Sequence, residues 1–400
     1  MGAACACALA ALFSGGAQAK PIAGLSRDLP SAGPHVARAV EADEANLPYG
    51  GGPVLHSNRT HVIFWQPAGS GLTFDPGYEA LIETFLSNVA AASHESTNVY
   101  GLTGQYTDAH GAAAYDSRYG GAVLATDPLP PNGCTEPPAT GPGWTVCLTD
   151  LQLQAEIEHV VRTDHLPTGP TDVYFLVTPN GLGSCTDATS STCALGGSAG
   201  YCGYHSVTND GLVLYAVIPY NAVPGHCSSD NPRPNGSTAD PALSSISHEH
   251  SEMITDPSGD AWIDAAGEED GDLCRFSFGA PIGGSGSTAW NEMIHGGHYF
   301  LQEEWSNASS ACEPRAKSYS VSFEAAPIPP RISSLSFTAH VHDANAPVLS
   351  YRWFFGDGDS GVGRTTSHRY GRLGRYRVVL RTTDSWGNWA FDARVIRIVR

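Results

Sequence analysis

Charged residues are scarce in this sequence, and basic residues are the scarcest of them. Only 15% of the 400 residues are charged, well below the roughly 25% of ordinary soluble domains. The 21 Lys and Arg residues are outnumbered by 40 Asp and Glu residues, which gives a formal net charge of −19. A surface of that sign repels phosphate backbones and anionic membranes. The composition therefore argues against nucleic acid as a partner.

Long apolar runs are also missing after residue 19, so the sequence predicts no membrane span. Residues 1–19 are a short apolar run that ends in Ala17-Gln18-Ala19, the small-x-small pattern that signal peptidase cleaves. The usual basic segment before such a run is missing, which leaves an Ala-rich buried helix as the alternative. We interpret residues 1–19 as a signal peptide, and the chain as an extracellular, secreted protein.

Paired cysteine motifs are absent as well, since no CxxC pair occurs, which argues against a zinc ribbon or a thioredoxin-like redox site. Eight cysteines follow the signal peptide, and an even number in an exported chain predicts disulfide bonds. Connectivity does not follow from sequence alone. We expect sequence-near pairing: Cys134 with Cys147, Cys185 with Cys193, Cys202 with Cys227, and Cys274 with Cys312.

The amino-acid composition and the spacing of apolar residues change along the chain and divide it into four segments. Residues 20–50 are rich in Pro and Ala without periodicity, which predicts a flexible leader or pro-segment. Residues 51–315 alternate helix and strand signals and form the main domain, of mixed α+β class. Residues 316–327 are the predicted linker. Residues 328–400 consist of short alternating segments typical of an all-β sandwich.

Within the main domain, apolar spacing predicts helices over 75–92 and 149–162. Buried strands are expected at 61–65, 171–179 and 211–220, where β-branched and aromatic residues are bounded by turn residues. The segment between the last two strands, residues 180–206, is rich in Gly, Ser and Cys. It predicts an irregular loop tied by disulfide bonds.

The C-terminal segment carries a recognisable pattern: Trp353, Phe355, Gly356-Asp357-Gly358, His368, Tyr370, Gly374, Tyr376 and Asp384. In order and spacing this pattern resembles the PKD domain, over roughly residues 328–400. The resemblance implies an immunoglobulin-like β-sandwich that serves as an extracellular spacer or accessory domain. Asp357 and Asp359 could offer oxygen ligands to Ca²⁺, but carboxylates in a tight turn more often cap the turn, and we favour that role.

The stretch "SHEHSEMITDP", residues 247–257, is close to the HExxH pattern of zinc peptidases, with Glu252 in place of the second histidine. Asp240 and Pro241 are helix start signals, and Pro257 predicts an end near Asp256. Spacing of four places His248 and Glu252 on one face, where both could bind one cation. Glu249 would then be the general base. The alternative is a solvated charged helix face.

A third ligand is expected from the acidic run at residues 267–274, where Glu269 and Asp272 are the candidates. The alternative for this run is a calcium-like or simply exposed loop. Asp256 lies two turns past His248 and is a secondary candidate, either as a ligand or as an acceptor for His248. His205 is the other secondary candidate. His295 and His298 have HxxH spacing, but the glycines between them favour a hairpin turn.

Five stretches together resemble a family of secreted bacterial and fungal metallopeptidase-like proteins distantly related to plant Exordium-like proteins: "GYHS", "LVLYAVIPY", "ISHEHSEMITDP", "AWIDAAGEEDGDLC" and "LQEEWSNASSAC". The resemblance spans roughly residues 50–315. It implies site roles for the matching residues His248, Glu249, Glu252, Asp256, Glu269, Asp272, Trp305 and Asn307. His250, Ser251 and Asp270 depart from it, at positions where apolar residues are expected.

Two functions are consistent with these observations. One is a secreted zinc-dependent peptidase with Zn²⁺ on His248, Glu252 and Asp272 or Glu269, acting on a protein or peptide substrate. The other is a non-catalytic wall or matrix protein in which the same residues hold a structural ion, such as Ca²⁺, or none. An anionic Glu252 would acidify water less than a histidine ligand would. The residues do not identify a substrate or an oligomeric state.

Overall fold

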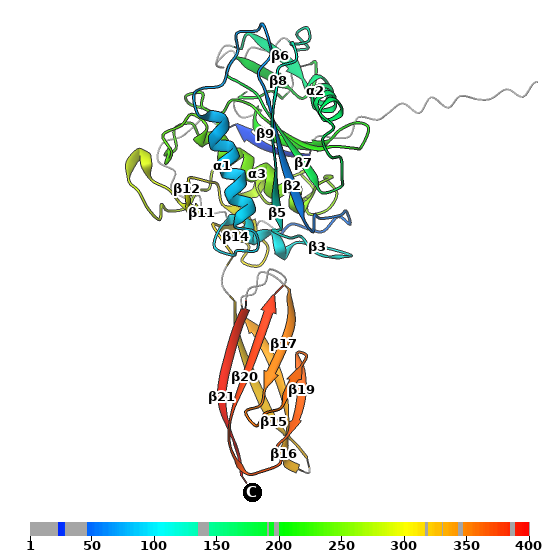
Figure 1. The fold of residues 1–400 in the computed structure, drawn as a ribbon, viewed down its shortest axis with the longest axis vertical. Helices are drawn as coiled ribbons and strands as arrows, with labels where there is room; N and C mark the ends of the chain where they lie inside the picture. The colour runs from blue at the N-terminus through cyan, green and yellow to red at the C-terminus, as the bar shows by residue number, and fades with distance from the viewer. Residues whose placement is uncertain are drawn as a thin grey trace, which may run out of the picture.

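Two bodies follow one another along the chain (Figure 1). The computed structural model describes residues 23–28, 46–134, 144–189, 192–195, 200–316, 319–329, 331–342, 347–384 and 389–399. The larger body, up to residue 316, mixes helices and strands, and the C-terminal body consists of strands. This agrees with the predicted succession of a mixed domain and a strand-rich domain. The predicted signal peptide lies outside the described residues.

A six-stranded sheet organises the larger body. Its strand order is β1 (Ala23–Asp28), β9 (Gly200–Val207), β10 (Leu214–Ile218), β7 (Asp172–Val177), β2 (Asn58–Trp65) and β5 (Ser117–Ala125). The last four strands are parallel, whereas β9 is antiparallel to both of its neighbours. Every residue of β7 is buried, as expected for a central parallel strand covered on both faces. The three predicted strands are confirmed as β2, β7 and β10.

Three helices pack on this sheet: α1 (Tyr78–Ala91), α2 (Asp150–Thr163) and α3 (Asp240–Thr255). α1 lies against β2 and β5, and α3 lies against β9 and β10. α2 starts with a capping box in which Thr149 and Gln152 satisfy each other's backbone N–H groups. α3 has Pro241 in its first turn and ends directly before Asp256, as predicted. The helices predicted over 75–92 and 149–162 are confirmed as α1 and α2.

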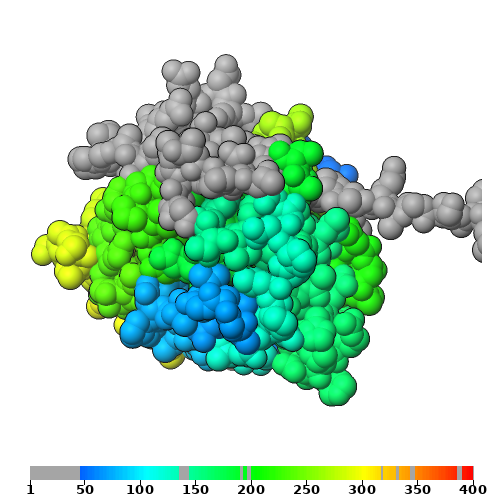
Figure 2. All heavy atoms as spheres, turned by 90° about the horizontal axis from the view of Figure 1, so that it is seen from above, coloured from blue at the N-terminus to red at the C-terminus, as the bar shows by residue number. Residues whose placement is uncertain are grey.

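Short elements complete this body. They are η1 (Val99–Gln105), β3 (Thr107–Asp108), β4 (Gly111–Ala112), β6 (Val146–Thr149), β8 (Leu182–Cys185), η3 (Asp272–Cys274), η4 (Gly286–Thr288), β11 (Glu292–Ile294), β12 (Gly297–Tyr299), β13 (Glu304–Ser306) and β14 (Ala311–Glu313). β11 and β12 form a hairpin with positive φ angles at His295 and Gly296. This confirms the turn expected there. The yellow segment that holds the hairpin projects from the side of the domain in Figures 1 and 2.

Two expectations for the larger body are wrong in part. Residues 23–28, placed in a flexible leader, form β1, because their backbone pairs with the outer edge of β9. Residues 180–206, expected to be an irregular loop, contain β8 and β9 at their two ends. Backbone pairing with β6 and β10 overrides the Gly- and Ser-rich composition of this segment.

All four predicted disulfide bonds are present: Cys134–Cys147, Cys185–Cys193, Cys202–Cys227 and Cys274–Cys312. Three of them brace segments that carry little regular structure. Cys202–Cys227 joins β9 to the loop before α3, and Cys274–Cys312 joins η3 to β14. The last two bonds therefore restrain the two segments that face α3.

The C-terminal body is a sandwich of two sheets. One contains β15 (Ser320–Ile328), β16 (Arg331–His342) and β19 (Thr365–Arg369), and the other contains β18 (Ser360–Val362), β17 (Val348–Phe354), β20 (Gly374–Asp384) and β21 (Trp389–Ile398). Strand pairing in the sandwich begins before the expected domain start at residue 328. Residues 320–327, assigned to the linker, form most of β15 and pair with β16.

Trp353 fills the space between the two sheets, as the sequence predicts. Its side chain is fully buried and packs on Phe323 and Phe337, with ring centroids 5.3 and 5.6 Å away. Its indole N–H donates to the carbonyl of Gly363 at 2.9 Å. The tight turn after β17 requires Gly356, where φ is +83° and an added Cβ would lie 2.7 Å from the Arg377 carbonyl oxygen.

Trp353→Ala should therefore lower the free energy of unfolding of the sandwich by roughly 3–5 kcal/mol, because it empties the centre of this small core. Phe354→Ala is the matched control, since Phe354 is the next residue of β17 and is 47% exposed. Calorimetry of the whole chain should show a lower melting transition for the sandwich in the first variant and a minor shift in the control. Equal shifts would show that Trp353 is not the core residue described here.

Candidate metal centre

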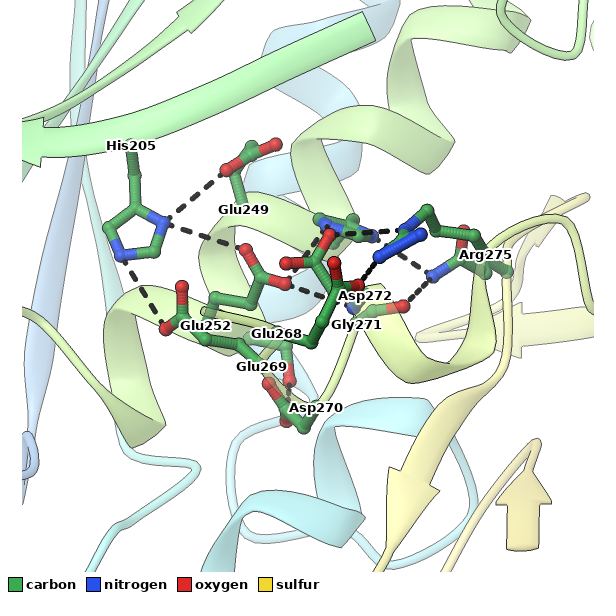
Figure 3. A network of polar contacts seen from close by, with 12 residues as sticks. His205, Glu249, Glu252, Glu268, Glu269, Asp270, Gly271, Asp272 and Arg275 are labelled. Carbon is green, nitrogen blue, oxygen red and sulfur yellow. Dashed lines mark hydrogen bonds and ion pairs between the residues drawn. The ribbon is translucent and has the colours of Figure 1, made fainter. Parts of the chain in front are cut away.

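α3 carries the site predicted from the sequence, and it is buried along its entire length. All 16 of its residues are buried, including His248, Glu249 and Glu252. A buried carboxylate or imidazole is tolerated only when other polar groups or a cation satisfy it. The surroundings of α3 therefore show what each of these side chains can do, and Figure 3 shows the arrangement.

His248, Glu252 and Asp272 form the first group. His248 Nε2 lies 3.0 Å from Glu252 Oε1 and 3.7 Å from Asp272 Oδ1. Although these atoms are close, His248 Nε2 makes no hydrogen bond. The three donor atoms lie within 4.8 Å of one another. Asp272 Oδ1 also lies 3.4 Å from Arg275 Nε. An imidazole nitrogen that faces two carboxylates without a hydrogen bond is placed as a metal ligand would be. The structure thus brings together the predicted helix pair and one of the two candidate third ligands.

His205 forms a second group with Glu249 and Glu252. It reaches from β9 toward α3, with Nδ1 3.4 Å from Glu249 Oε2 and 3.6 Å from Glu252 Oε2 (Figure 3). Its other ring nitrogen, Nε2, donates to the backbone carbonyl of Asp256 at 3.2 Å. Burial acts to lower the pKa of His205, but the carboxylates raise it to about 10, so without a cation Nδ1 also carries a proton and donates to Glu249. The two oxygens of Glu252 therefore face two different histidines.

Two glycines make room for these side chains. A Cβ on Gly203 of β9 would lie 2.9 Å from Glu249 Oε1, and a Cβ on Gly271 would lie 2.7 Å from His248 Nδ1. Any larger residue at either position would displace the side chain that it faces. The close approach of β9 and of the segment before η3 to α3 thus depends on these two residues.

The orientation of the Gln302 amide and the tautomer of a neutral His248 depend on each other. Its amide nitrogen donates to the Gly271 carbonyl at 2.7 Å and lies 2.9 Å from His248 Nδ1. In this arrangement Nδ1 accepts, and the ring proton lies on Nε2, toward Glu252. A cation at Nε2 requires the opposite tautomer, with the Gln302 amide turned so that its oxygen accepts from Nδ1–H. Metal binding at His248 is thus coupled to the orientation of Gln302.

The three departures from the family pattern satisfy one another or a neighbour. Asp270 accepts hydrogen bonds from the Ser251 hydroxyl at 2.9 Å and from the Thr255 hydroxyl at 3.1 Å. His250 pairs with the side chain of Asn58 at 2.9 Å. Burial lowers the pKa of His250 to about 3, so this ring is neutral. These residues support α3 rather than the two ligand groups.

Glu269 and Asp256, both named from the sequence, take other positions. Glu269 is fully buried with neither oxygen hydrogen-bonded, and its Oε1 lies 3.9 Å from His205 Nε2, on the far side of that ring. It does not belong to the His248 group. Asp256 Oδ1 accepts from the backbone N–H groups of Asp260 and Ala261, both at 2.8 Å. Asp256 therefore holds the turn after α3 through these two bonds.

Sequence reasoning missed Glu304 of β13. This residue is fully buried, and neither of its carboxylate oxygens has a hydrogen-bond partner. Burial and the neighbouring acidic residues, Asp270 first among them, raise its pKa well above 4.5. All three residues of β13 are buried, and so short a strand gives no periodic pattern in the sequence. Trp305 and Asn307 follow Glu304 and also match the resemblance described from the sequence. Their contacts are structural, because Asn307 bonds the backbone of Leu47 and accepts from the indole N–H of Trp305.

The titratable groups of the site have strongly shifted pKa values. Burial raises the pKa of Glu249 to about 7, against the hydrogen bond from His205. Burial also acts to raise the pKa of Glu252, but the charge of His248 and the bond with His205 hold it at about 2. Burial acts to lower the pKa of His205, yet its bonds to Glu249 and Glu252 raise it to about 10. Without a cation, Glu252 is therefore ionised between two histidines, His205 and His248, whose pKa values are both raised.

A further oxygen-rich group lies in the sandwich, where Asp357, Asp359 and His368 come together at the turn after β17. Asp357 accepts from the backbone N–H of Asp359 at 3.3 Å and contacts His368 Nε2 at 2.7 Å. These bonds are those of a carboxylate that stabilises a turn. They fit the turn role that the sequence favours for Asp357.

The donor set at α3 fits a divalent cation. Each group offers one imidazole nitrogen and two carboxylate oxygens, the ligand types that Zn²⁺ accepts in hydrolases. His248 Nε2 makes no hydrogen bond, and Glu252 Oε2 has an ion-pair contact with His205 Nδ1 at 3.6 Å but no hydrogen bond, so a cation would satisfy both atoms. The residues present therefore fit the ion that the sequence motif implies.

This fit predicts how stability depends on pH. Without metal, stability should fall as pH rises from about 4.5 to about 7, because folding raises the pKa of Glu249 and Asp270 to about 7 and the folded state then holds more protons. It should fall further toward pH 10, because folding raises the pKa of His205 to about 10. A bound cation replaces those protons, so its stabilisation should grow with pH.

Melting temperatures between pH 4 and 9, measured with a chelator and with added Zn²⁺, test this. We expect the two curves to meet near pH 4.5 and to separate as pH rises. If Zn²⁺ leaves the melting temperature unchanged at pH 8, the fit to a cation is wrong.

Comparison with known proteins identifies the C-terminal body. Residues 329–396 match the family model described as PKD domain, which confirms the resemblance seen in the sequence. The PKD1 domain of the Vibrio cholerae metalloprotease PrtV is 23% identical over 21% of this chain and 100% of that chain, with a TM-score of 0.20. The PKD1 domain of Vibrio anguillarum Epp is 27% identical over 21% of this chain and 96% of that chain, also with a TM-score of 0.20.

One solved structure aligns with most of the chain. Catalytically inactive OgpA from Akkermansia muciniphila, in complex with an O-glycopeptide substrate, covers 91% of this chain and 98% of its own, at 11% identity and a TM-score of 0.22. TM-scores this low support no conclusion about fold or function. PKD domains and multiple disulfide bonds are typical of extracellular proteins. Among the described helices, none has the length and apolar character needed to cross a membrane.

Proposed function

We propose that the chain is a secreted zinc-dependent peptidase with a PKD accessory domain. The observation that carries the proposal is the convergence of three buried donors. His248 Nε2, Glu252 Oε1 and Asp272 Oδ1 face one another within 3.7 Å of the imidazole nitrogen, and that nitrogen makes no hydrogen bond. This is the arrangement expected when the second histidine of an HExxH helix is replaced by glutamate.

His248, Glu252 and Asp272 would hold the ion. A Zn²⁺ ion bound there would supply Lewis acidity toward the scissile carbonyl and lower the pKa of a water molecule at the site. Two carboxylates among three ligands reduce its net charge, so we expect weaker acidification of water than at a site with more histidines. Turnover should accordingly be lower than in enzymes with two histidines on the helix.

Glu249 would take the proton of the attacking water and pass it to the leaving amine. A general base works best when its pKa lies near the operating pH, and burial raises that of Glu249 to about 7. His205 is the positioning residue: it holds Glu249 Oε2 through Nδ1 and is itself anchored on the Asp256 carbonyl. The turn that Asp256 stabilises thereby sets the direction of the base.

A second function is favoured by a different observation. His205, Glu249 and Glu252 are fully buried, which suits a structural ion in a non-catalytic wall or matrix protein better than a site that must admit a substrate. In that case the ion would lie between His205 and the two glutamates. The accessory sandwich is compatible with either function, because a PKD domain can bring its neighbour to polymeric or surface-bound material. The two variants below separate these functions.

Glu249→Gln should retain Zn²⁺ at near-stoichiometric level but lower peptide hydrolysis by roughly 10²–10⁴-fold, because an amide cannot accept the water proton. Glu324→Gln, an exposed change on the sandwich, is the control and should leave both properties unchanged. Metal analysis and hydrolysis of an unfolded protein substrate provide the measurements. Unchanged hydrolysis would rule out Glu249 as the base. Loss of Zn²⁺ would instead favour the His205 group as the binding position.

Glu252→Ala should lose the metal, because it removes the residue that both ligand groups share. The matched control is Glu156→Ala, which removes another buried glutamate from a helix, α2, away from the site. Metal content after gel filtration and the melting-temperature gain from added Zn²⁺ are compared. If Glu252→Ala still binds Zn²⁺ as the parent does, neither ligand group is the metal centre.

A further inference from the structure

A strand of the chain's own leader occupies the edge of the sheet beside the candidate metal centre. β1 pairs antiparallel with β9, with Ala23 opposite His205 and Ser26 opposite Gly203. His205 is the residue that contacts Glu249, and Gly203 is the residue on which Glu249 packs. The backbone of the leader therefore runs along the part of β9 that faces the proposed base.

β1 also reaches the other elements of the site. It lies against α3, which carries His248 and Glu252, and against η3, which carries Asp272. A strand that contacts β9, α3 and η3 passes across the site rather than beside it. With this strand in place, none of His205, Glu249 and Glu252 has any exposed surface.

Substrate cannot reach a site that is closed in this way. A cavity of about 10 Å³ lies at Ser244, Arg275 and Gln302, next to His248, and has room for one water molecule but not for a peptide. A polypeptide would need an open edge and an extended path past Glu249. The position of β1 is such a path.

We infer that the outer edge of β9 is the binding site for an extended peptide segment of the substrate, and that residues 23–28 fill it as a built-in competitor. This rests on the proposed peptidase function. Addition of a strand to a sheet edge uses main-chain hydrogen bonds and tolerates many sequences. The tether gives the leader a high effective concentration, so it excludes free peptides until the chain is cut between Asp28 and Asn46.

Contacts at the start of the folded domain support the idea that the leader can be removed without loss of the domain. Asn46 and Leu47 are bound by Asn307: the Leu47 N–H donates to Asn307 Oδ1 at 2.9 Å, and the Asn46 amide donates to the Asn307 carbonyl at 2.8 Å. A cut before Asn46 would therefore free β1 while leaving the domain's own N-terminal anchor in place.

The test disrupts β1 in the full exported chain without touching the site. Ser26→Pro/Arg27→Pro removes two adjacent N–H groups from β1, so strand pairing cannot persist. Ala37→Pro/Arg38→Pro places two prolines elsewhere in the leader as the control. Amide hydrogen exchange of residues 200–207 should accelerate at least tenfold in the first variant and not in the second, because several backbone hydrogen bonds are lost. Hydrolysis of an unfolded protein substrate should rise by a similar factor.

A synthetic peptide of residues 20–31 should restore the protection of residues 200–207 in the disrupted variant and inhibit its hydrolysis competitively. Unchanged exchange in Ser26→Pro/Arg27→Pro overturns the inference, even if the parent hydrolyses peptides. Faster exchange that the peptide reverses, without hydrolysis by any zinc-loaded form, supports the peptide-binding edge and counts against the peptidase function. The two failures are therefore distinguishable.

Discussion

The burial of ionisable side chains between α3 and the sheet is the constraint on which the rest of the larger domain depends. An isolated charge in a protein interior costs several kcal/mol even after relaxation, so each such group needs a partner. Glu252 and Glu249 are held by the two histidines, and Asp270 is held by hydroxyl groups. Glu269 and Glu304 have no hydrogen-bond partner at their carboxylates, and burial keeps both in the neutral form through pKa values well above 4.5.

Two disulfide bonds hold the partners of α3 in register. Cys202 lies three residues before His205 on β9, and Cys274 lies two residues after Asp272 in η3. Without these bonds, the short η3 turn would have few restraints other than its side chains. Loss of order there would move Asp272 and Gly271 away from His248, whose ring fits directly against Gly271. The bonds therefore stabilise the site as well as the fold.

The sandwich and the larger domain contribute different properties. The sandwich has its own core around Trp353, and the described residues of the α3 site all belong to the larger domain. The larger domain contains the candidate metal centre, beneath the antiparallel edge of its sheet. An antiparallel edge strand next to a buried polar site is suited to align an extended chain, because main-chain groups alone define the register.

Sequence alone determined the local features of this protein, because they depend on short spacings. The limits of α3 followed from Pro241 and Pro257, the pairing of His248 with Glu252 followed from their spacing of four, and the PKD pattern identified the sandwich. Nearby cysteines paired as expected because short loops bring them together most readily.

Only the tertiary structure decided the contacts between distant segments. It brought His205 to Glu249 across 44 residues, placed Asp272 rather than Glu269 beside His248, and buried Glu304 near the same helix. It also showed that residues 23–28 form a strand, although their composition favours a flexible leader. Such contacts depend on strand order and on the close approach permitted by Gly203 and Gly271, which no local pattern records. Local periodicity specifies an element and its faces, whereas the packing of distant elements specifies which of those faces meet.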